Sequence, residues 1–138
     1  MTSPYVENPI YVGAFSRSPY QYLIRGDPQD NTMAETECAR WAGGHLITIA
    51  DKDEADFVSN MFPGKVHWIG LRQRTTDKGR FEWTDGESPT FSNWQNESLA
   101  TVSGFDCTAV WPSRKWDHLS CSQKLPFICK RPLAELEP

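Results

Sequence analysis

The chain has 138 residues and a formal net charge of −4, with 38% hydrophobic, 23% charged and 12% aromatic residues. This length fits one domain, and an aromatic content that includes six tryptophans excludes a disordered chain. The negative charge offers no field for a nucleic-acid backbone, and no segment approaches 18 consecutive apolar residues. We therefore expect neither nucleic-acid binding nor membrane insertion.

The first clear strand signal is the aromatic and aliphatic segment Tyr20–Ile24, which Gly26 and Pro28 bound. Residues 1–19 are expected to be an N-terminal segment that leads into the domain. The domain itself is expected to occupy residues 20–132.

A first helix is expected to begin at Asp30 or Asn31, both good N-caps, with Thr32 and Glu35 at capping-box spacing. Gly43-Gly44 is expected to stop it. The apolar residues on one stripe of this helix are Ala34, Cys38, Trp41 and Ala42.

A short strand, His45–Ile49, follows, and Asp51 with Glu54 then starts a second helix that ends at Pro63-Gly64. The predicted buried face of the second helix consists of Ala55, Val58, Met61 and Phe62.

The segment His67–Leu71 is too apolar for a strand with one solvated face, so it is expected to be buried on both faces at the centre of the core. A polar loop, 72–80, follows, and Asp85-Gly86 is a tight turn.

The segment 92–106 has little periodicity, which inside a compact domain is typical of a binding loop, and Trp94 and Phe105 are its aromatic anchors. Residues 133–138 are a predicted tail. Three further strands are expected at Thr108–Trp111, Lys115–His118 and Phe127–Lys130.

Four cysteines, without zinc-finger spacing, lie at positions 38, 107, 121 and 129. Four cysteines allow three connectivities. The nested pairing of Cys38 with Cys129 and of Cys107 with Cys121 is favoured, because the first two lie near the ends of the core and the second two flank a hairpin-like segment. Two disulfides indicate an extracellular chain, either secreted or an ectodomain. Four free thiols in a cytosolic protein are the alternative.

These features occur in an order that resembles the C-type lectin-like domain over residues 20–131. The shared features are two helices, the Trp68–Leu71 strand, the Trp83–Gly86 turn, Asn93-Trp94, Trp116 and a Cys-x13-Cys-x7-Cys ending. The resemblance implies an α+β double-loop fold with two helices, small antiparallel sheets and a long irregular binding loop. It also implies the nested disulfides.

The calcium-dependent sugar site of that family requires a Glu-Pro-Asn or Gln-Pro-Asp triplet in the long loop and an Asn-Asp pair after a strand tryptophan. The matching positions here hold Glu97-Ser98-Leu99 and Asp117-His118, and Phe105 stands where members carry a further glutamate. Leu99 and His118 replace oxygen donors that calcium requires. We therefore expect no cofactor. If calcium binds, Glu97 and Asp117 are its predicted ligands.

Other interpretations of the polar residues compete with this one. Four residues could form a transition-metal or acid/base site: Glu97, Asp106, Asp117 and His118. The favoured alternative is that they are loop and strand-end residues, each solvated separately. No hydrolase, zinc-protease or phosphate-loop motif is present, so we predict that the chain is not an enzyme. Residues 25–27 match an integrin-binding tripeptide, but three-residue matches often arise by chance, and the glycine and aspartate are adequately explained as turn residues.

Basic residues form two groups that could attract sulfated glycans or an acidic protein if they met on one face, although a solvated loop is the favoured alternative. The first group is Arg72, Arg74, Lys78 and Arg80, and the second is Arg114, Lys115, Lys124, Lys130 and Arg131. Asn96-Glu97-Ser98 is an N-glycosylation sequon, which predicts a glycoprotein.

The sequence predicts a non-catalytic extracellular recognition module that binds a protein or glycan through the long-loop face without calcium. A calcium-dependent carbohydrate-binding lectin with an altered site is the alternative. The predicted ligand-binding residues are Trp94, Glu97, Ser98, Leu99, Phe105, Arg114, Lys115, Asp117 and His118.

Overall fold

The computed structural model describes residues 9–11, 20–61, 64–73, 80–95 and 106–132. In chain order the elements are β1 (Pro9–Tyr11), β2 (Tyr20–Gln29), α1 (Asn31–Ala39), β3 (His45–Leu46), α2 (Lys52–Met61), β4 (His67–Gln73), β5 (Phe81–Trp83), β6 (Cys107–Val110), β7 (Trp116–Leu119) and β8 (Leu125–Pro132). Among the described residues, no helix has the length and apolarity needed to cross a bilayer.

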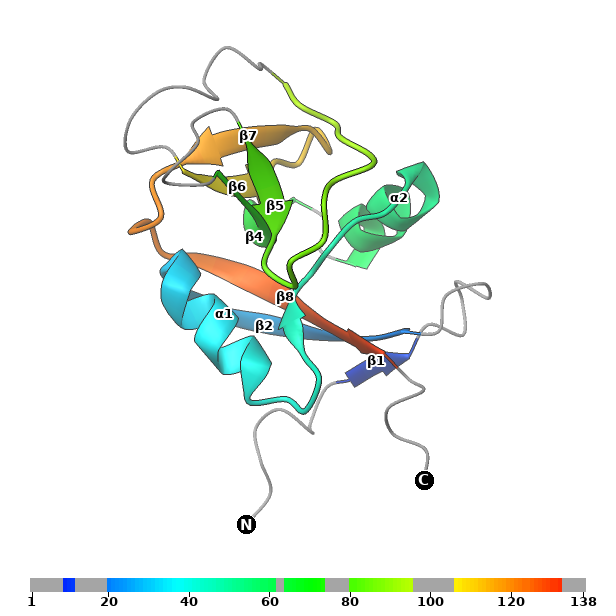
Figure 1. The fold of residues 1–138 in the computed structure, drawn as a ribbon, viewed down its shortest axis with the longest axis vertical. Coiled ribbons are helices and arrows are strands. Elements are labelled where there is room, and N and C mark those ends of the chain that lie inside the picture. The colour runs from blue at the N-terminus through cyan, green and yellow to red at the C-terminus, as the bar shows by residue number, and fades with distance from the viewer. Residues whose placement is uncertain (1–8, 12–19, 62–63, 74–79, 96–105, 133–138) are drawn as a thin grey trace.

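One sheet joins all the strands in the order β1-β2-β8-β4-β6-β7, with β3 paired to β8 and β5 paired to β4 (Figure 1). The pairings are antiparallel except between β4 and β8, which run parallel where Trp68 faces Phe127. Two helices with this sheet give the predicted α+β fold. Because β6 and β7 continue the sheet beyond β4, the base of the long loop is fixed on rigid strands.

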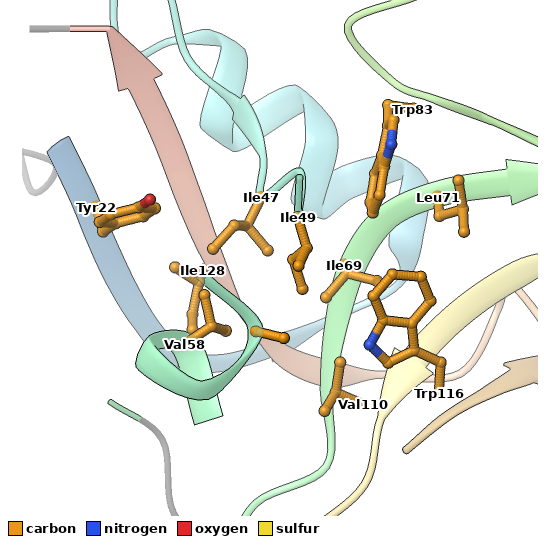
Figure 2. Close-up of a cluster of buried hydrophobic side chains, with 11 residues drawn as sticks. Tyr22, Ile47, Ile49, Val58, Ile69, Leu71, Trp83, Val110, Trp116 and Ile128 are labelled. Atoms are coloured by element: carbon orange, nitrogen blue, oxygen red, sulfur yellow. The ribbon is translucent and has the colours of Figure 1, made fainter. Parts of the chain in front are cut away.

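Strand β4 is buried along almost its whole length, which confirms the prediction for the central strand. Its side chains alternate between two core clusters, because successive residues of a strand point to opposite faces. Ile69 and Leu71 enter the cluster drawn in Figure 2, whereas Trp68 enters the other cluster beside Phe127 and Cys129.

The N-terminal half contains two differences from the predicted strands. Strand β2 continues past Gly26 and Pro28 to Gln29, because a register shift between Arg25 and Gln29 lets the proline occupy an irregular part of the strand. Strand β1, which was not predicted, pairs with β2.

Helix α1 ends at Ala39, before the predicted stop, so Trp41 and Ala42 lie outside it, and Ala42 is exposed. The predicted capping box does not form. The Asp30 side chain accepts the N–H of Met33 at 2.7 Å instead. The carboxylate of Glu35 is directed at β3, where it accepts the backbone N–H of Leu46 at 2.9 Å.

Strand β3 ends at Leu46, three residues before its predicted end. The segment after it enters the core, where Ile47 and Ile49 are buried (Figure 2). Helix α2 starts as predicted, with the Asp51 side chain accepting the N–H of Glu54 at 2.8 Å. Ala55 and Val58 form its buried face, while the side chains of Met61 and Phe62 lie outside the described residues.

Both predicted disulfides are present. Cys38 of α1 pairs with Cys129 of β8 at a Cα separation of 5.3 Å, and Cys107 of β6 pairs with Cys121 at 5.1 Å. The first bond joins two cysteines that lie 91 residues apart in sequence. The second closes the chain around β7, so it holds the strand that carries the candidate site.

Candidate functional site

Strand β7 presents alternate side chains to the core. Trp116 and His118 are buried, whereas Asp117 and Leu119 are only half-buried. This alternation follows from the two-residue period of a strand paired to β6 along its whole length. The adjacent residues Asp117 and His118 therefore point to opposite faces of the sheet.

His118 lies in a stack of rings, which we call the loop-base stack: Phe81, Trp94 and His118. The imidazole centroid is 4.3 Å from that of Trp94, at an interplanar angle of 26°, and 5.1 Å from that of Phe81. The residue is only 2% exposed, and neither ring nitrogen has a hydrogen-bond partner within the described part of the chain. Burial lowers the pKa of His118, against the opposing effect of the Asp117 carboxylate. At neutral pH the ring is therefore uncharged.

Trp94 is held at the edge of the sheet by its neighbours. The N–H of Trp116 donates to the carbonyl of Asn93 at 2.9 Å, and the N–H of Gln95 donates to the carbonyl of Trp116 at 2.8 Å. The Trp94 ring also meets the Trp116 ring edge-on at 5.7 Å. These contacts fix a half-buried indole where the long loop begins.

The tip of the β6–β7 hairpin is connected to this same segment. The Asn93 amide donates to the carbonyl of Arg114 at 2.7 Å and accepts the Lys115 ammonium at 3.2 Å. The Arg114 guanidinium extends the other way, to Asp56 and Asn60 of α2 at 3.1 and 2.9 Å. The hairpin tip thus bridges the loop base and α2.

A pocket of about 290 Å³ opens beside the loop-base stack. Phe81 and Trp94, whose centroids are 5.2 Å apart, contribute to its wall. The remaining described lining residues are Leu71, Pro89, Thr90, Phe91 and Ser92. An aromatic pocket with a few hydroxyl groups is a common form of small-ligand site.

Comparison with known proteins identifies the family. The sequence profile described as "Lectin C-type domain" matches residues 28–131. The chain is 36% identical over 126 residues to one chain of the snaclec anticoagulant protein of Deinagkistrodon acutus, covering 83% of this chain and 82% of that relative. The chain belongs to the C-type lectin domain family.

Other relatives support the same assignment. Regenerating islet-derived protein 3-alpha of Mus musculus is 31% identical over 79% of this chain and 69% of its own length. The C-type carbohydrate-recognition domain of cow CD23 matches with a TM-score of 0.79 and 28% identity, over 95% of this chain and 96% of that structure. A calcium-independent type II antifreeze protein has a TM-score of 0.76 at 21% identity, covering 83% of this chain and 88% of that structure, which shows the fold alone. C-type lectin domains are non-catalytic binding domains.

In this C-type lectin domain, only part of the predicted ligand surface can be placed. Five predicted residues lie on β7 or next to it. Asp117 and His118 are on β7, Arg114 and Lys115 are at the tip of its hairpin, and Trp94 is in the segment hydrogen-bonded to it. The structure thus brings these residues near one end of the sheet, although His118 faces inward. The other predicted positions lie outside the described residues: Glu97, Ser98, Leu99, Phe105 and the predicted glycosylation site Asn96.

The acidic candidates for a metal or acid/base site have local roles. The Asp117 side chain accepts the N–H of His118 at 2.8 Å, and that of Asp106 accepts the Gln73 amide at 2.9 Å. No group of three or more potential metal-ligating side chains occurs among the described residues.

Three of the basic residues have contacts within the fold and so contribute little to a shared basic face. Lys130 is buried against Glu54, and Arg131 lies over the ring of Trp41. Arg72 donates to the side chain of Asn31, the first residue of α1, at 2.6 Å. Arg74 and Lys78 lie outside the described residues.

The tripeptide 25–27 lies within β2 rather than on a projecting turn. Arg25 is directed toward Glu37 of α1, at 4.0 Å, and its side chain is only 18% exposed. The arginine of the tripeptide thus contributes to the packing of α1 on the sheet, which favours a structural explanation for it.

Sequence reasoning missed Phe81, Phe91 and Asn93 as parts of the site. Phe81 and Phe91 line the pocket, and Asn93 joins the loop base to the hairpin tip. The density of aromatic residues between 81 and 94 was a usable signal. It could not indicate which rings face one another.

Proposed function

We propose that this C-type lectin domain is an extracellular, non-catalytic recognition module that binds a protein or glycan at the long-loop face without calcium. The observation that carries the proposal is the position of His118. At the strand position where the family motif requires an oxygen ligand for calcium, this chain has an imidazole that is buried in the loop-base stack. A buried neutral ring cannot replace a carboxylate in a calcium shell.

The proposed ligand surface consists of Trp94 with the hairpin-tip residues Arg114 and Lys115, and of the long-loop residues Glu97, Ser98, Leu99 and Phe105. An indole held by backbone hydrogen bonds is a suitable anchor, because aromatic and arginine side chains contribute most to recognition surfaces. One relative, from Trimeresurus stejnegeri, is named a snaclec coagulation factor IX/factor X-binding protein, and it is 35% identical over 105 residues. Binding without chemistry is thus a function of this family, and two disulfides fit an extracellular location.

The proposal predicts that ligands bind equally well with and without calcium. On a glycan array, each glycan bound in millimolar calcium should be bound to the same extent in excess EDTA. Trp94→Ala should weaken that binding at least about tenfold, because it removes the anchoring ring. Met33→Ala, which removes an exposed apolar side chain from α1, is the control and should have no effect. Signals that disappear in EDTA would instead support a calcium-dependent lectin that uses Glu97 and Asp117.

A further inference from the structure

Arg114 has an unusual backbone conformation for its residue type. Its φ is 73°, in the left-handed region, and it is the only non-glycine residue with positive φ among those the structure describes. It closes the β6–β7 hairpin, where its N–H donates to the carbonyl of Trp111 at 2.8 Å. A glycine would make the same turn without the cost of about 1 to 2 kcal/mol that an L-residue pays there. Arg114 thus occupies this turn position at a cost in backbone energy.

The Arg114 side chain lines a small cavity that we call the α2–hairpin pocket. Its volume is about 110 Å³, whereas a water molecule occupies about 30 Å³ in the liquid, so the cavity has room for one tetrahedral oxyanion. Its described lining residues are Ser59, Asn60, Gly64, Lys65, His67, Trp111, Pro112 and Arg114.

The charge of this lining is positive although the whole chain is negative. Lys65 and Arg114 supply two cations, and no carboxylate is among the described lining residues. Lys65 is exposed and forms no ion pair with any described residue, so its ammonium is available to a ligand. Burial lowers the pKa of His67 to about 4, so His67 forms a neutral wall at physiological pH.

The carboxylate that pairs with Arg114 does not neutralise the pocket. Asp56 pairs with Arg114 at 3.1 Å, but it also pairs with Lys52 at 2.9 Å, and both cations lower its pKa, the Lys52 hydrogen bond most. Asp56 and Asn60 take only two of the five N–H donors of Arg114. They orient the guanidinium and leave it able to bind an anion as well.

We propose that the α2–hairpin pocket binds the tetrahedral oxyanion of a sulfate or phosphate ester. Lys65 and Arg114 contact the anion, and the hydroxyl of Ser59 and the amide of Asn60 can donate to its oxygens. Trp111 and Pro112 provide an apolar wall for the ring that carries the ester. This site goes beyond the proposed function, because its lining shares only Arg114 with the long-loop surface and includes no residue of the loop-base stack.

The first test is a titration with sodium sulfate followed by ¹⁵N–¹H NMR, with sodium chloride at matched ionic strength as the reference. Sulfate should shift the amide resonances of Gly64, Lys65 and Arg114 more than chloride does. Titrations with N-acetylglucosamine 6-sulfate and with glucose 6-phosphate then distinguish a sulfated from a phosphorylated source. The ester that binds more tightly identifies the source. If these three residues respond identically to sulfate and chloride, the proposal is wrong.

The second test uses charge variants. Lys65→Gln should weaken binding of sulfate and of the preferred ester about tenfold, the usual effect of losing one charge-assisted hydrogen bond. Lys124→Gln removes the same charge from an exposed site outside the pocket and should change affinity less than about twofold. If both variants weaken sulfate binding equally, the anion is attracted only by the general charge of the surface, and the proposed site is wrong.

A third variant separates binding from folding. Arg114→Gly removes the guanidinium and relieves the left-handed backbone, so the hairpin should fold while oxyanion binding is lost. Trp94→Ala should leave oxyanion binding unchanged, which keeps this proposal independent of the long-loop surface. If Arg114→Gly binds sulfate as the unmodified chain does, Arg114 is only a structural link to α2.

Discussion

Replacing Trp68 with alanine is expected to lower the free energy of unfolding by about 3 to 5 kcal/mol, the usual range for removing a large buried aromatic side chain. Trp68 has no exposed surface, and its indole N–H donates to the carbonyl of Gln29 at 2.9 Å. Alanine would leave a cavity beside Phe127 and would also leave that carbonyl without its donor. A urea melt monitored by circular dichroism measures the change.

Trp94→Ala provides the comparison for this prediction. Trp94 is half-buried, so less apolar surface returns to water and the loss of stability should be smaller. An unchanged denaturation midpoint for Trp68→Ala, or a larger loss for Trp94→Ala, would contradict the placement of β4 at the centre of the core.

The second large effect is expected at the buried ion pair between Lys130 and Glu54, whose charged atoms lie 2.6 Å apart. The side chains are only 7% and 4% exposed. The Lys130 ammonium also donates to the carbonyl and the hydroxyl of Thr48, each at 2.9 Å, and Tyr22 donates to Glu54 at 2.5 Å. Lys130→Ala leaves a buried carboxylate without its counter-ion, which costs about 3 to 5 kcal/mol in comparable cases.

The exposed pair of Lys52 and Asp56 is a matched control, since it has the same charges and a similar separation of 2.9 Å. Lys52→Ala should cost less than about 1 kcal/mol, because solvent screens a surface pair. The double variant Lys130→Met with Glu54→Leu should recover much of the stability lost in Lys130→Ala. Equal losses for Lys130→Ala and Lys52→Ala in denaturant melts would show that burial of the first pair has been misjudged.

Local signals predicted those parts of the fold that depend on neighbouring residues. The cap of α2 at Asp51 and the buried strand β4 follow from residues adjacent in sequence. The end of β3 and the passage of β2 through Pro28 were not predictable in this way, because each depends on pairing with distant strands. No local pattern predicted the pairing of Glu54 with Lys130, because the two residues are 76 positions apart in the sequence.

The candidate site was predictable in outline only. The family motif predicted the positions of β7 and the long loop, and it placed His118 where family members have an oxygen ligand. The two-residue period of β7 could have placed His118 on the buried face with Trp116. That His118 stacks on Trp94 and Phe81 depends on contacts between three separate segments, which no local pattern specifies.

Calcium titration by thermal melt tests the central claim of calcium-independent recognition most directly. A site with an affinity of about 10 μM would stabilise the fold by about 2.7 kcal/mol at about 1 mM calcium, which corresponds to a rise of several degrees in Tm. Because His118 is held within the loop-base stack, the account predicts that millimolar calcium raises Tm by no more than about one degree relative to EDTA. A rise of several degrees that EDTA reverses would contradict it.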